Sequence, residues 1–138
     1  MKNALTTIQI LIRLTGTVVL ILGLLFWADL DPNLIKIHIV VGGVLVLLLW
    51  GLAFLAARAR VSTGLVVLDV AWSLVLPALG LTQAQILPGP AHWVIHVVHL
   101  LVGMGALGQA EMMAGRIKAN LDTRRPGKRS AQRARAGG

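Results

Sequence analysis

Three histidines stand within eight positions of an otherwise apolar run, "HWVIHVVHLL", at residues 92 to 101. His92, His96 and His99 are spaced at i, i+4 and i+7, so a helix over this run would place all three imidazoles on one face. An ionisable side chain inside an apolar segment is by default a candidate functional group. The spacing therefore predicts a shared histidine-based site.

The composition of the chain predicts a membrane protein. Of its 138 residues, 57% are hydrophobic and only 13% are charged, with a mean hydropathy of +0.81. A helix needs about 20 apolar residues to cross the hydrocarbon core of a bilayer. The chain has four runs of about this length, at residues 5–27, 34–57, 64–82 and 91–114. We therefore predict an all-α, integral membrane, up-down-up-down four-helix bundle that occupies residues 1–118.

The distribution of positive charge predicts how the chain is oriented. Six of the 13 basic residues lie in the terminal stretch "NLDTRRPGKRSAQRARAGG", whereas the connections "ADLDPN" and "TQAQILPGP" hold two acidic residues and no basic one. By the positive-inside rule both termini are cytoplasmic. We expect residues 119–138 to form a disordered basic tail that lies against lipid headgroups, with no nucleic-acid partner. The expected location is the plasma (inner) membrane of a bacterium.

Polar and small residues recur on one face of each predicted helix, and leucine, valine and isoleucine occupy the other faces. The polar and small faces are expected to line the interior, while the large apolar side chains face lipid. Arg13 and Asp69 both enter from the cytoplasmic side. We predict that they form an inner ion pair that locks the first helix to the third. Glu111, near the cytoplasmic end of the fourth helix, is expected to pair with Arg58 or Arg116.

The histidines lie in the outer half of the predicted bundle. His38 lies about five residues after Asn33, which is about 8 Å from the outer end of the second helix at a rise of 1.5 Å per residue. The second and fourth helices are diagonal neighbours in an up-down-up-down bundle, so His38 and His99 can face each other across the interior. Two such imidazoles can bind the two axial positions of a haem iron. Gly42 and Gly103, each one turn further inward, would let the backbone approach the flat macrocycle.

Three further residues accompany this pair. Lys36 and His92, nearer the outer surface, are expected to neutralise the haem propionates. His96 matches His38 in depth slightly better than His99 does, but it has no glycine four positions on. We therefore assign His38 and His99 as the iron ligands and keep His96 as the alternative ligand or as a residue that supports the ligand.

His38 of the second helix and His99 of the fourth are each followed by glycine four positions later. In this they resemble the haem ligands of the membrane cytochrome b families. The resemblance covers residues 5 to 114. It implies an electron carrier, rather than a stand-alone enzyme, that holds haem b and exchanges electrons with a quinol or a redox partner at the outer face. In the quinol-oxidising cytochrome b, these two helices carry a second histidine fourteen positions on, which holds an inner haem, and this chain has Leu52 and Met113 there. We therefore expect one haem.

Two other functions fit the same residues. The imidazoles could hydrogen-bond across helices in a non-catalytic accessory subunit of a larger membrane complex. Alternatively, His92 and His96 could bind zinc or copper with His38 as a third ligand, in a metal site or a transporter that works as a homo-oligomer. The chain has no cysteine, which excludes thiolate ligands and covalent haem attachment. A visible spectrum separates these functions, because haem is coloured and zinc is not.

Overall fold

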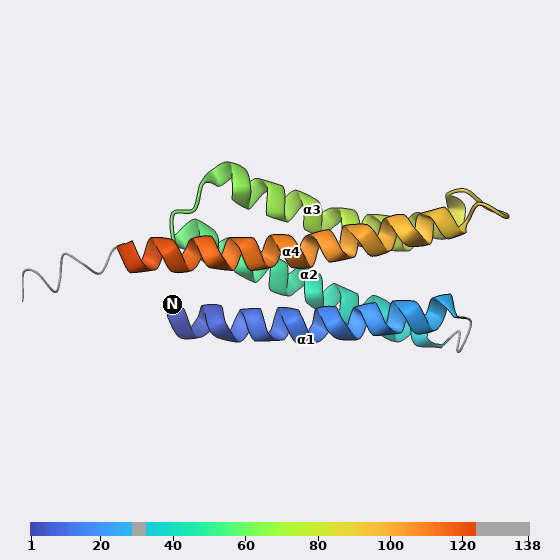
Figure 1. Cartoon of the computed structure of the whole chain (residues 1–138), viewed down its shortest axis with the longest axis horizontal. Coiled ribbons are helices and arrows are strands. Elements are labelled where there is room, and N and C mark those ends of the chain that lie inside the picture. Colours follow the sequence, from blue (N-terminus) through green and yellow to red (C-terminus); the bar gives the residue numbers. More distant parts are fainter. Residues whose placement is uncertain (29–32, 124–138) are drawn as a thin grey trace, which may run out of the picture.

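The computed structural model describes residues 1–28 and 33–123, and these form a bundle of four long helices (Figure 1). Successive helices run antiparallel to one another, and within the described ranges there is no β-strand. The predicted all-α, up-down-up-down four-helix bundle is thereby confirmed. Its elements in chain order are α1 Lys2–Trp27, α2 Leu34–Arg58, α3 Thr63–Thr82, the short 3₁₀ helix η1 Gln83–Gln85, and α4 Trp93–Thr123.

All four helices are long and apolar enough to cross a membrane, judged by their length and composition. Their outer faces carry large apolar side chains that are more than half exposed in the isolated chain, among them Leu14, Val40, Leu47, Val67 and Leu101. Soluble monomers rarely expose so much contiguous apolar surface. The outer faces are therefore largely apolar, as expected, although the side chains of Arg13 and Glu111 are exposed there as well.

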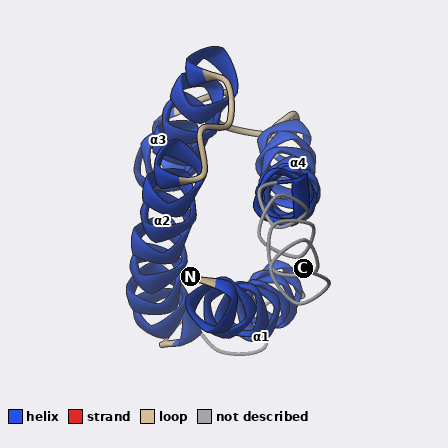
Figure 2. Ribbon diagram, turned by 90° about the vertical axis from the view of Figure 1, so that its left-hand side faces the viewer, coloured by secondary structure: helices blue, strands red, loops and turns tan. Residues whose placement is uncertain are grey.

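The helices α2 and α4 meet across the diagonal of the bundle. Each of these two helices packs against every other helix, whereas α1 and α3 lie at opposite corners of the described structure (Figure 2). Small side chains on α2 and α4, such as Ala56 and Ala110, are fully buried and permit this approach. The diagonal relation expected for the second and fourth helices is present.

The packed core occupies the half of the bundle that holds the start of α1 and the end of α4. In the predicted orientation this is the cytoplasmic half. The buried residues of this cluster are Leu5, Ile12, Leu45, Leu49, Leu52, Ala56, Ala59, Val61, Ala106, Ala110, Met113, Ala114 and Ile117. The outer half contributes little to this cluster, and it is there that the histidines lie.

The fourth helix is longer than the sequence predicts. It ends at Thr123 and not near residue 114, so the prediction of a disordered tail from residue 119 is wrong for residues 119–123. Tertiary contacts stabilise this last turn and a half. The Lys2 Nζ lies 2.6 Å from the Asp122 Oδ1, and the Asn120 side-chain amide donates to the backbone carbonyls of Ala59 and Arg60. The rest of the predicted tail, residues 124–138, lies outside the described residues.

Overpacking the α2–α4 contact should destabilise the bundle. Ala56 has no exposed surface, so we expect Ala56→Leu to lower the free energy of unfolding by about 1–3 kcal/mol, since the larger side chain forces the helices apart. The neighbouring Ala57 is exposed, and Ala57→Leu is the matched control. Unfolding in detergent followed by circular dichroism compares the two. Equal midpoints for both variants would contradict the packing described here.

Candidate functional site

His38 and His99 face each other across the diagonal of the bundle. Their ring centroids are 6.2 Å apart and their planes are tilted by 50°. His38 comes from the second turn of α2 and His99 from the second turn of α4, and because these two helices run parallel to each other, both rings lie at the same outer depth. The structure therefore brings together the two residues that the sequence pairs.

Two cavities border this histidine pair. The first is lined mainly by α1 and α4 and, with its open mouth, contains about 840 Å³ of space that protein atoms do not fill. The second is lined mainly by α2 and α3 and contains about 830 Å³. Both values include the open mouths of the cavities, so the space enclosed between the helices is smaller. The residues that line both cavities are Val19, Ile35, His38, Leu45, Leu76, Gln83 and His99.

The glycines that touch the histidine rings differ from those that the sequence predicts. A Cβ built on Gly23 of α1 would lie 3.3 Å from the His38 Cε1, and one built on Gly80 of α3 would lie 3.4 Å from the His99 Cε1. Each imidazole ring is thus packed closely against a glycine of an adjacent helix. Sequence analysis missed Gly23, because spacing within one helix does not reveal which residue of another helix lies opposite.

The two predicted glycines border open space instead. Gly42 lines the second cavity, and no described atom lies within 4 Å of a Cβ built on it. Gly103 lines the first cavity, where such a Cβ would lie 3.9 Å from the Leu76 Cδ2. Both positions therefore leave room beside the histidine pair, as expected, although neither contacts the rings.

His96 and His92 form a separate aromatic group at the outer end of α4. The His96 ring makes edge-on contacts with the rings of Trp27 and His92, with ring centroids 5.8 Å and 4.6 Å apart. The same ring lines the first cavity. The His92 Nδ1 lies 3.2 Å from the Ile86 carbonyl oxygen, which connects His92 to the loop before α4. Of the two candidate ligands on α4, His99 is the one whose ring faces His38 at 6.2 Å.

The expected outer charges do not reach the cavities. Among the described residues that line the two cavities, neither Lys36 nor His92 is present. The polar side chain found there is Gln83, from the 3₁₀ helix that follows α3. Sequence analysis missed this residue, since it lies in a connection whose path over the bundle is set only by tertiary packing.

A three-ligand metal site is not assembled in the described part of the chain. No group of three or more His, Cys, Asp or Glu side chains there is close enough to hold a metal ion. The sequence suggests a set made of His38, His92 and His96. In the structure the His38 ring lies next to His99, whereas His92 and His96 contact each other. Within the described residues, His38 and His99 are therefore the two predicted ligands that the fold brings close together.

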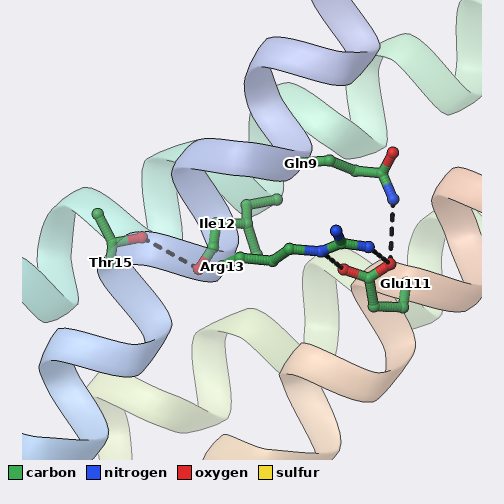
Figure 3. A network of polar contacts seen from close by, with 5 residues as sticks. All are labelled: Gln9, Ile12, Arg13, Thr15 and Glu111. Carbon is green, nitrogen blue, oxygen red and sulfur yellow. Dashed lines mark hydrogen bonds and ion pairs between the residues drawn. The ribbon is translucent and has the colours of Figure 1, made fainter.

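The predicted ion pair between Arg13 and Asp69 is wrong. Arg13 binds Glu111 with two hydrogen bonds, from Nε to Oε1 at 2.6 Å and from Nη2 to Oε2 at 2.8 Å (Figure 3). The Gln9 amide donates to the same carboxylate at 3.0 Å. The physical reason is the arrangement of the helices. Arg13 on α1 is adjacent to α4, whereas Asp69 is on α3, at the opposite corner.

Asp69 is instead buried in the packed half of the bundle. It is 3% exposed, and its Oδ2 has no hydrogen-bond partner among the described residues. One turn further along α3, the buried Ser73 hydroxyl accepts a hydrogen bond from the Trp50 Nε1 and donates to the Val70 carbonyl. The serine thus links α3 to α2, while the carboxyl group of Asp69 takes no part in the link between α1 and α4.

A double-mutant cycle should show that Arg13 is coupled to Glu111. We expect Arg13→Gln and Glu111→Gln each to lower the unfolding midpoint in detergent, and the double variant to lose less than the two losses combined. The matched control is Arg13→Gln with Asp69→Asn, whose effects should add because these residues share no contact. Coupling to Asp69 together with additivity at Glu111 would restore the pairing expected from the sequence.

Comparisons with protein-family models, with curated proteins and with solved structures found no match to this chain. The similarity to membrane cytochromes b therefore rests on the histidine and glycine positions alone. A function has to follow from the geometry around His38 and His99.

Proposed function

We propose that this chain binds one haem b between His38 and His99 and works as a membrane electron carrier. The observation that supports this proposal is the 6.2 Å separation of the two ring centroids. Imidazole nitrogens bind first-row metal ions such as zinc at about 2.0–2.1 Å, so two rings on opposite sides of one ion have centroids roughly 6 Å apart. This separation is compatible with His38 and His99 as the two residues that would hold one haem iron.

The buried ring nitrogens support the same proposal. The Nδ1 atoms of His38 and His99 are both buried and have no hydrogen-bond partner in the described part of the chain. Buried polar atoms in proteins are nearly always hydrogen-bonded, and an exception points to an ion or another bound group. These two unpartnered atoms lie on neighbouring rings beside two largely apolar cavities, which supports a bound group at this position.

A single haem is the number that the packing favours. Leu52 and Met113 occupy the positions where the quinol-oxidising cytochrome b, which the chain resembles, carries the histidines of an inner haem, and these two residues are 0% and 1% exposed. Both belong to the packed core, so other side chains fill the space that an inner macrocycle would need. The proposed site is therefore confined to the half of the bundle that carries the cavities.

The residues around the proposed site have separable roles. Bound haem iron supplies one-electron oxidation and reduction. His38 and His99 would hold the iron, while Gly42 and Gly103 border the space for the macrocycle. The leucine, isoleucine and valine side chains of the cavities exclude water and lower the local dielectric constant, which disfavours a net charge on the site. Gln83 offers a polar contact on the side nearest to the helix ends.

The orientation predicted by the basic residues places this site near the outer face of the plasma membrane. A haem at that depth is close to one surface and far from the other. We therefore propose that electrons are exchanged with a quinol or a redox partner at the outer face, while both termini lie in the cytoplasm. Lys36 near the outer end of α2 and His92 just before α4 do not line the cavities, and they are proposed to attract that partner rather than the propionates.

The ligand assignment predicts the visible spectra of three single variants. His38→Ala and His99→Ala should each abolish the sharp dithionite-reduced bands of six-coordinate haem, because one axial ligand is lost. His92→Ala, whose ring lines neither cavity among the described residues, should keep full haem content. If His99→Ala keeps its haem and His96→Ala loses it, the ligand on α4 is His96. Full haem in both His38→Ala and His99→Ala would overturn the site.

Filling the second cavity should displace the cofactor without disturbing the protein. A side chain on Gly42 would enter open space, so we expect Gly42→Leu to keep the bundle folded while haem content falls. The control is Gly64→Leu in the first turn of α3, where a side chain also meets no described atom within 4 Å. Haem absorbance per chain measures the difference. Equal haem content in the two variants would show that the cofactor does not use this cavity.

A further inference from the structure

An ion pair lies exposed at the middle depth of the bundle. The side chains of Arg13 and Glu111 are 63% and 43% exposed. Arg13 lies about 16 Å along α1 from Lys2, at a rise of 1.5 Å per residue. This is about half of the roughly 30 Å hydrocarbon core of a bilayer. Charged side chains at such a depth almost always face protein or a water-filled cavity rather than lipid.

The same face of α4 is shaped for close helix contact. Gly108 and Gly115 lie three residues before and four residues after Glu111, so all three share one side of the helix. Both glycines are exposed, and no described atom lies within 4 Å of a Cβ built on either. Small residues at lipid-facing positions permit the close approach of another helix. The glycines therefore flank the exposed carboxylate with a surface that a neighbouring helix can reach.

We propose that this α1–α4 face, defined by Arg13, Gly108, Glu111 and Gly115, is the interface of a parallel homodimer. A two-fold axis along the bilayer normal brings the same surface of both chains together and keeps each residue at its own depth. Arg13 can then lie opposite the partner's Glu111, and Glu111 opposite the partner's Arg13. The four groups alternate in sign, and lipid is excluded from all of them.

Charge complementarity favours a second copy over an unrelated partner. A foreign helix would need a cation and an anion at matching depth and in the reverse order, whereas a second copy supplies both by symmetry. A second exposed ion pair, between Lys2 and Asp122, also joins α1 to α4. Lys2 is as many residues from Arg13 as Asp122 is from Glu111, so both ion pairs fit one antiparallel alignment of the two helices. This proposal rests on the exposed ion pair and the two flanking glycines, and it does not depend on haem.

Single-cysteine crosslinking in native membranes tests the interface, and the natural chain contains no cysteine. Gly108→Cys and Gly115→Cys place a thiol on the proposed face. Leu47→Cys is the control, because Leu47 is 64% exposed and lies on α2, outside the proposed face. Its depth is similar to that of Glu111, since Leu47 is as many residues from Arg58 at the end of α2 as Glu111 is from Asp122 near the end of α4. After mild copper-catalysed oxidation, we expect a disulfide-linked dimer of at least one glycine variant in several-fold excess over the control. Yields no higher than the control, or crosslinks mainly to a different protein, would overturn the proposal.

A charge-reversal series tests whether the ion pair itself holds the dimer. In the Gly108→Cys chain, Arg13→Glu should remove the crosslink, because four carboxylates would then meet at the interface. Adding Glu111→Arg restores alternating charges within and between the chains and should restore the crosslink. Circular dichroism checks that each chain stays helical. An undiminished crosslink in a helical Arg13→Glu chain would show that Arg13 and Glu111 lie outside the interface.

Discussion

The close contact between α2 and α4 across the diagonal of the bundle is the interaction on which the other features depend. Ala56 of α2 and Ala106, Ala110 and Ala114 of α4 are buried there, and their small side chains let the two helices meet. Where these helices reach the other half of the bundle, their histidines are already opposite each other. The same contact keeps α1 and α3 at opposite corners, which is why Arg13 pairs with Glu111 on the adjacent helix.

The two halves of the bundle differ in packing: one half holds the hydrophobic core, and the other holds the cavities of the proposed site. Leucine, alanine and methionine side chains fill the half that carries the start of α1 and the end of α4. The other half holds two cavities and four histidines, and the buried Nδ1 atoms of His38 and His99 have no hydrogen-bond partner in the described structure. Such a region is less stable by itself, and a bound cofactor would supply the missing contacts. If haem binds as proposed, it would thus have a structural role as well as a redox one.

Features that depend on one helix at a time were predictable from the sequence. Hydropathy located the four helices, and periodicity identified the inward faces that carry Asp69, Ser73 and Ala110. The pairing of His38 with His99 followed from the order of the helices in an up-down-up-down bundle. Features set by the register between helices were not predictable. The contact of Gly23 with the His38 ring, the partner of Arg13, and the extension of α4 to Thr123 all depend on how neighbouring helices align.

The number of haem groups per chain tests the central claim most directly. Purified chain, expressed with ample haem, would be assayed for haem iron by elemental analysis and for protein by amino-acid analysis. One iron per chain, extractable as haem b, is the result that the facing pair of His38 and His99 and the filled inner half predict. Chain without iron would contradict a haem site, and two irons per chain would contradict its confinement to the outer half.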